Sequence, residues 1–267
     1  MRLCFEILSR QRLCIRAMVS SVCAIGLLGS EEVRAALPPI TWSGAQTVSG
    51  DSDVDTTGSL VYAFTFGGTS APPSTTVNGV TFSPFTIPSG IITSATVGNV
   101  TISESPGTLF GSNSFGSASA PFSGLSSSYQ SLLGTGAYAD VPATITVTLK
   151  GLTSGQQYRL QWWTSDAALQ SPIYGGSFTN TTATAVNSVT LDANTTNAVG
   201  GLGQFAIGTF TASGTSQPFT LAETSGGSNP LINALQLRAV PEPSTCASLL
   251  AGLACGGYSM LRRRKQA

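Results

Sequence analysis

Residues 144–150 read TITVTLK, and this stretch decides the fold class. Ile145, Val147 and Leu149 alternate with three threonines. A period of two is that of a β-strand, because successive side chains of a strand point to opposite faces of its sheet. The alternation therefore predicts a half-buried strand with threonine on its solvent side.

Similar short runs, separated by turn residues, continue through the chain between Ile40 and Arg238. One segment differs, because SSSYQSLL at residues 126–133 has a serine cap and stops at Gly134, which predicts a short helix. The whole pattern predicts an all-β fold, an antiparallel β-sandwich of jelly-roll-like type, over residues 36–240. The alternative is that the body is divided into two domains near Pro121. The other alternating runs are Leu60–Phe66, Tyr158–Trp163, Phe205–Ile207, Phe219–Leu221 and Leu231–Leu237.

Charge and side-chain usage exclude several function classes. Only 9% of the 267 residues are charged, and the stretch from Leu37 to Val240 holds three basic residues against eight acidic ones. No basic patch for nucleic acid can be built from three residues, so nucleic acid is excluded as a partner. The chain has no histidine, and all five cysteines lie in its end segments. Zinc chemistry and Ser/His or Cys/His catalysis are therefore excluded for the body.

The first 35 residues have the three-part form of a secretory signal. Basic residues extend to Arg16, an apolar stretch covers residues 17–29, and Val33 and Ala35 form a V-x-A cleavage site. The apolar stretch would rise about 20 Å as a helix, which is too short to cross a bilayer. We therefore expect export and cleavage by signal peptidase, with an uncleaved signal anchor as the alternative.

The last segment predicts a transmembrane helix at residues 244–261, which carry no charge. As a helix this segment is about 27 Å long, enough for a slightly thinned bilayer. Arg262, Arg263 and Arg264 follow immediately and should stay cytoplasmic, with the body on the opposite side.

Pro241, Glu242 and Pro243, followed by this apolar segment and the arginine cluster, resemble the PEP-CTERM sorting signal of exported bacterial proteins. The resemblance covers residues 241–267. It implies recognition by an exosortase-type membrane protease, transient anchoring, cleavage near the motif, and delivery to the cell surface or extracellular matrix. Pro241, Glu242, Pro243 and the three arginines would be the sorting residues. An ordinary membrane anchor is the alternative.

The body is also similar to galactose-binding-like β-sandwiches found in PEP-CTERM proteins. The segments that carry this resemblance are strand and turn sequences such as DVDTTGSLVYAF, TVNGVTF, LTSGQQYRLQWWTSDA and INALQLRAVPEP. Sandwiches of this kind often bind carbohydrate, so extracellular polysaccharide is the implied partner. A shared fold does not fix a function.

DSDVD places Asp51, Asp53 and Asp55 at alternate positions, as a calcium ion would require of carboxylate ligands. Thr56 and Tyr62 stand where an EF-hand needs Gly and Glu, so an EF-hand is rejected. A structural calcium site is one interpretation. The other is that the three acids solvate a loop before the strand that begins near Ser59.

Trp162 and Trp163 are adjacent, so on a strand they must point to opposite faces. An exposed Trp163 would stack on a sugar ring, with Asp166 accepting hydrogen bonds from the sugar hydroxyls. The competing interpretation buries Trp163 under a covering loop.

The chain lacks the common nucleophile, nucleotide and metalloprotease motifs, so we expect a non-catalytic module and no catalytic residues. No cofactor is expected beyond the structural calcium. The alternative is a secreted glycan hydrolase, with Asp166 and either Asp192 or Glu223 as its carboxylate pair. A third class is a structural matrix protein without a ligand.

Overall fold

The computed structural model describes residues 39–70, 73–140, 142–169, 180–184, 188–223 and 229–241. These ranges are mostly strand, with one α-helix, α2 (Ser127–Leu133), and two short 3-10 helices, η1 (Asp51–Asp53) and η2 (Phe122–Gly124). The predicted all-β class is confirmed. The predicted signal peptide, the transmembrane helix and the sorting residues after Pro241 lie outside the described residues.

The larger sheet has eight strands. Its pairs are antiparallel except for one, since Phe64 to Gly67 run parallel to Ser83 to Thr86. The parallel pair arises because β5 inserts between β3 and β4. The predicted wholly antiparallel sandwich is wrong at this point. In spatial order the strands are β1 (Thr41–Trp42), β14 (Gln204–Thr211), β11 (Gln157–Thr164), β17 (Ala234–Ala239), β3 (Ser59–Gly67), β5 (Val80–Thr86) and β4 (Thr75–Val77), with β2 (Gln46–Thr47) also on β14.

A second sheet of six strands contains the TITVTLK segment as β10 (Thr144–Lys150). Ile145, Val147 and Leu149 are fully buried and the threonines between them are half-buried, as the alternation predicted. The other strands are, in order, β13 (Val189–Asp192), β12 (Asn180–Thr184), β15 (Ser216–Glu223), then β10, then β7 (Val100–Ser105) and β6 (Ser94–Val97). A third sheet holds β16 (Leu231–Ile232), β9 (Gly136–Ala139) and β8 (Leu109–Ser112).

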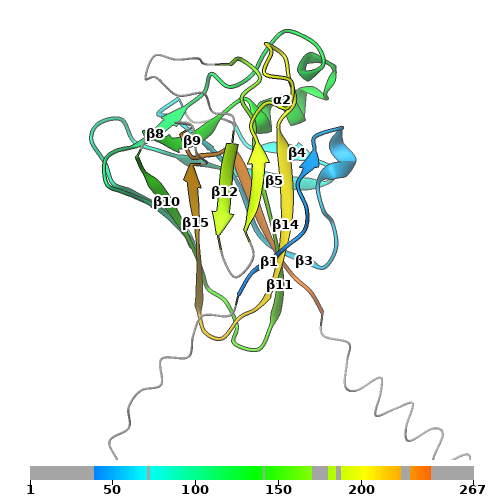
Figure 1. Ribbon diagram of the computed structural model, residues 1–267. Coiled ribbons are helices and arrows are strands. Elements are labelled where there is room, and N and C mark those ends of the chain that lie inside the picture. Colours follow the sequence, from blue (N-terminus) through cyan, green and yellow to red (C-terminus); the bar gives the residue numbers. More distant parts are fainter. Residues whose placement is uncertain are drawn as a thin grey trace, which may run out of the picture. The chain divides into compact units, whose positions relative to one another are not determined.

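The two large sheets share one apolar core, which is the arrangement of a β-sandwich (Figure 1). Trp42 of β1 packs edge-on against Phe219 of β15 with ring centroids 5.8 Å apart, so aromatic rings from the two sheets meet. Trp162 lies fully buried in the same core. The jelly-roll-like connection of the strands stays a prediction.

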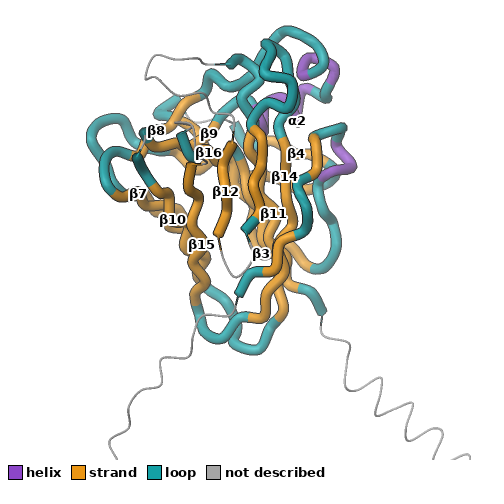
Figure 2. The backbone as a smooth tube through the Cα atoms, in the orientation of Figure 1, coloured by secondary structure: helices purple, strands orange, loops and turns teal. Residues whose placement is uncertain are grey.

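The outer face of the eight-stranded sheet is covered as well. A second apolar cluster joins Trp163, Phe82 and Phe205 of this sheet to Tyr129 and Leu132 of α2. Helix α2 begins as predicted, because the Ser126 side chain accepts a hydrogen bond from the Tyr129 N–H. Helix α2 lies beside β4 (Figure 2). None of the helices in the described ranges is long and apolar enough to cross a membrane.

Both described ends of the chain lie at the same end of the larger sheet. Thr41 pairs with Thr209, and Arg159 pairs with both Thr209 and Arg238, so the four residues form one row across neighbouring strands. Strand β3 starts next to this row and runs about 24 Å to Gly67 at the opposite end. The sandwich therefore has a terminal end and a distal end.

Candidate functional site

The predicted sugar-stacking pair is wrong, because neither side chain reaches the surface. Trp163 is fully buried, its Nε1 donates to the Tyr129 hydroxyl at 2.9 Å, and its ring meets Phe82 edge-on. Asp166 is 2% exposed. The competing interpretation holds, since α2 and the loops around it cover the sheet face on which Trp163 lies.

The three aspartates of DSDVD do not converge on one point. Asp51 accepts from Ser126 Oγ, and Asp53 accepts from Ser49, Gly50 and the Tyr129 hydroxyl. Asp55 is instead ion-paired to Arg159. Among the described residues no group of three acidic, cysteine or histidine side chains is placed to hold a metal. The three aspartates therefore do not form one ligand set among the described residues, and calcium binding at DSDVD stays a prediction.

Of the carboxylates proposed for a hydrolase, the described Asp166 is closed off from the protein surface. Asp166 is buried, and Asp192 is half-buried at the end of β13, where burial raises the pKa of its carboxyl group. The Glu223 side chain lies outside the described residues. Substrate has no direct access to Asp166 in this arrangement.

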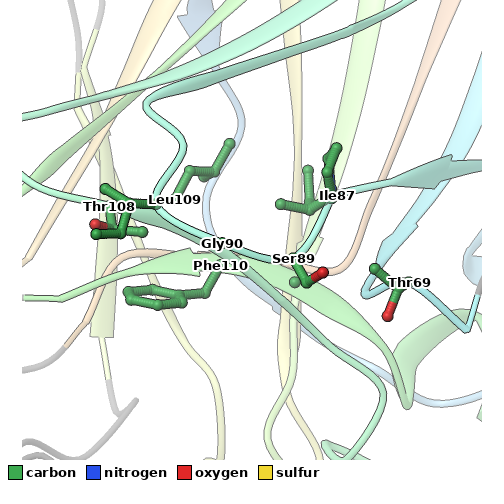
Figure 3. Close-up of a pocket in the computed structure, with 10 residues that line it drawn as sticks. Thr69, Ile87, Ser89, Gly90, Thr108, Leu109 and Phe110 are labelled. Carbon is green, nitrogen blue, oxygen red and sulfur yellow. The ribbon is translucent and has the colours of Figure 1, made fainter.

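A pocket of about 360 Å³ opens at the distal end of the sandwich (Figure 3). Three segments line it, and none of them contributes a charged side chain. Its lining consists of apolar groups, three hydroxyl side chains and glycine backbone. The lining residues are Thr69, Ile87, Pro88, Ser89, Gly90, Ile91, Thr108, Leu109, Phe110 and Gly111.

Backbone hydrogen bonds hold the three lining segments together. The Ile87 N–H donates to the Gly67 carbonyl at 2.8 Å, and the Leu109 N–H donates to the Ile92 carbonyl at 2.8 Å. Gly111 permits a close approach, because a Cβ there would lie 2.8 Å from the Gly68 Cα. The lining is thus set by the ends of β3, β5 and β8.

Two pocket residues present apolar surface. Phe110 stacks on Tyr138 of the neighbouring strand, with centroids 5.2 Å apart and an interplanar angle of 22°. Ile91 is 90% exposed. The sequence reasoning missed both. The available signal was Ile91 itself, an isoleucine directly after the Pro-Ser-Gly turn at residues 88–90.

Comparisons with known proteins give two weak structural likenesses. No family model matches the chain, and no curated protein matches it. The enzymatically active domain of bacteriophage CBA120 tailspike protein 4 is 15% identical with a TM-score of 0.32, and the match covers 53% of this chain and 19% of that one. A carbohydrate-binding module of the β-sandwich superfamily is 14% identical with a TM-score of 0.17, covering 73% and 96%. At these scores neither likeness carries an argument.

Proposed function

We propose that this chain is an exported cell-surface or matrix protein whose body contacts neutral carbohydrate through the distal pocket. The observation that carries the proposal is the uncharged pocket, placed at the end of the sandwich opposite both described chain ends. A body held at its terminal end would present this pocket outward. The lining supports this chemical class of ligand, because an uncharged, partly apolar pocket favours an uncharged, partly apolar ligand.

The pocket offers the two kinds of contact that a sugar ring uses. Ile91 and Phe110 supply apolar surface for the C–H faces of the ring, and Thr69, Ser89 and Thr108 supply hydroxyls for its polar edge. Ionic recognition plays no part, since no lining residue is charged. Binding should therefore be insensitive to salt.

The outer face of the six-stranded sheet has the same uncharged character. Thr96, Thr101 and Thr148 lie in one cross-strand row, and the first two hydroxyls are 2.9 Å apart. Such a face is compatible with a hydrated polysaccharide environment, where hydroxyl contacts replace ion pairs.

In this proposal the C-terminal segment, residues 241–267, directs the protein to the cell surface or matrix. Pro241 is exposed at the end of the described residues, directly before Glu242. In this proposal signal peptidase removes the leader, the tail anchors the chain transiently, and an exosortase-type protease cuts near Glu242. Glu242→Ala should leave full-length protein in membrane fractions. If the variant is processed and released like the wild type, the sorting assignment is wrong.

Binding of the full chain to a panel of neutral polysaccharides tests the pocket. Ile91→Ser should weaken binding to any retained glycan by about fivefold or more, because it removes exposed apolar contact. Val199→Ser is the matched control, since Val199 is also exposed, at 56%, and lies outside the pocket lining. Equal losses in the two variants would contradict the pocket assignment.

The same incubation separates the alternative classes. New reducing ends appearing over time would identify a glycan hydrolase instead of a binding module. Absence of binding across the panel, combined with retention of the protein in matrix fractions, would favour a structural protein without a ligand.

A further inference from the structure

Glu104 is an acidic side chain buried without a partner. It is the inward-facing residue near the end of β7, and it is 6% exposed. Both carboxyl oxygens are closed to solvent, and neither has a hydrogen-bond partner among the described residues. Buried polar atoms of folded proteins are almost always paired, so this group requires an explanation.

Neither protonation state of Glu104 explains this arrangement. An ionised carboxylate would be an unpaired buried charge, which is costly. A protonated carboxyl would bury an O–H donor without an acceptor, which also costs free energy. A positively charged species bound to the oxygens would satisfy them.

A second carboxylate stands nearby. Asp140 follows β9, and its charge adds to burial in raising the pKa of Glu104. Asn229, itself buried, donates from Nδ2 to Asp140 Oδ1 at 3.2 Å and so orients that carboxylate. Two acidic groups are therefore held at one end of the sandwich.

No basic side chain of the body neutralises this pair. Arg159 is ion-paired with Asp55, and Arg238 donates to backbone carbonyls of residues 56–58. Lys150 is the last residue of β10, about 17 Å along that strand from the residue paired with Glu104. The body has no other lysine, arginine or histidine. Within the body, no further basic side chain is therefore available to compensate this charge.

We propose that Glu104 and Asp140 bind a divalent cation, calcium in the first place. Calcium takes carboxylate oxygens at 2.3–2.6 Å, closer than a water molecule approaches, and tolerates irregular sets of oxygen ligands. Gly107 leaves the necessary room beside the carboxylate, because a Cβ at this position would lie 3.1 Å from Glu104 Oε1. The site differs from the aspartates of DSDVD and does not depend on the glycan proposal.

Calcium binding to the full chain tests the assignment, measured by calorimetry and by thermal unfolding in calcium and in chelator. Wild-type protein should bind calcium and unfold at a higher temperature in its presence. Glu104→Gln and Asp140→Asn should each weaken calcium binding by about tenfold or more, because each removes one charged ligand. Asp53→Asn is the matched control and should bind like the wild type.

The variants also separate a bound ion from a bound proton. If Glu104 is simply protonated, the wild type will show no calcium effect, and Glu104→Gln will be at least as stable in both media. That result overturns the proposal. A calcium effect that survives Glu104→Gln but disappears in Asp53→Asn also overturns it, by assigning the ion to the DSDVD loop.

Discussion

Arg159 Nε donates to Asp55 Oδ2, and this ion pair joins β11 to the loop that precedes β3. The Asp55 side chain is 9% exposed and also accepts from the Thr57 N–H. Beside it, Gln236 Nε2 donates both to the Asp55 carbonyl and to Gln161 Oε1. The loop is therefore tied to the outer face of the larger sheet by side chains of the sheet itself.

This contact makes stability depend on pH in the acidic range. Burial acts to raise the pKa of Asp55, but the hydrogen bonds from Arg159 and Thr57 outweigh it and hold the pKa below its usual 3.8. The stabilisation is therefore complete above that value and is lost as pH falls through the folded-state pKa. We expect the unfolding free energy of Asp55→Asn to change less with pH below 3.8 than that of the wild type. Denaturant titrations at neutral and acidic pH measure the difference.

Asp192→Asn provides a control of opposite sign. Burial raises the pKa of Asp192, so its ionised form is penalised in the folded state at neutral pH. Removing that carboxylate should increase stability at neutral pH, whereas Asp55→Asn should decrease it. Two variants that shift stability in the same direction would contradict these assignments.

The hydrogen bond between Trp163 and Tyr129 should be measurable in a double-mutant cycle. Trp163→Phe and Tyr129→Phe each remove one partner of the buried 2.9 Å bond while keeping an aromatic ring. We expect coupling of about 1 kcal/mol, the usual net value of such a bond. Trp163→Ala should cost about 3–5 kcal/mol because it empties a packed site. Additive effects of the two phenylalanine variants would mean that the bond contributes nothing to stability.

Alternation alone predicted the strand at residues 144–150 and its buried face, because the period of two reports which side chains share a face. It also placed Trp162 and Trp163 on opposite faces. It could not reveal that α2, some thirty residues earlier in the chain, covers the outer face and buries Trp163. Whether a sheet face is open depends on distant segments, and a local period carries no information about them.

The other candidate sites also depend on three-dimensional contacts that a local sequence pattern does not report. Asp51 to Asp53 form the turn η1, so their alternate spacing does not bring the carboxylates to one side as it would on a strand. The pocket joins segments from Thr69 to Gly111 that meet through backbone hydrogen bonds. Glu104 reads as an inward residue in VTISES, but its lack of a partner appears only in three dimensions.

Asn233 connects three parts of the fold, and its loss should be severe. Its Nδ2 donates to the carbonyls of Leu133, Thr135 and Ser165, and its Oδ1 accepts from the Ser165 N–H at 2.6 Å. Asn233→Leu would leave these buried backbone groups unpaired, at an expected cost of about 3 kcal/mol or more. Asn113→Leu is the control. Asn113 donates to the exposed Ser70 carbonyl and accepts from the part-buried Gly68 N–H, so it makes fewer and more exposed bonds than Asn233 and should change stability much less. Chemical denaturation gives both values.

Gly111 should be required for the pocket as well as for stability. A Cβ at this position would lie 2.8 Å from the Gly68 Cα and would also press on the Gly67 backbone, whose carbonyl holds Ile87. Because backbone atoms cannot move aside as a flexible side chain does, Gly111→Ala should force β3 and β8 apart. The expected cost is about 1–3 kcal/mol, together with weaker binding of any glycan that the pocket retains.

Gly124→Ala separates this steric effect from a general effect of adding a methyl group. A Cβ at Gly124 would meet nothing within 4 Å, and this residue does not line the pocket. We therefore expect its stability and glycan binding to match the wild type. If Gly111→Ala unfolds like Gly124→Ala and binds as well, then the close contact of β8 with the end of β3 does not shape the pocket. If it is destabilised but binds normally, the contact supports the fold without setting the lining.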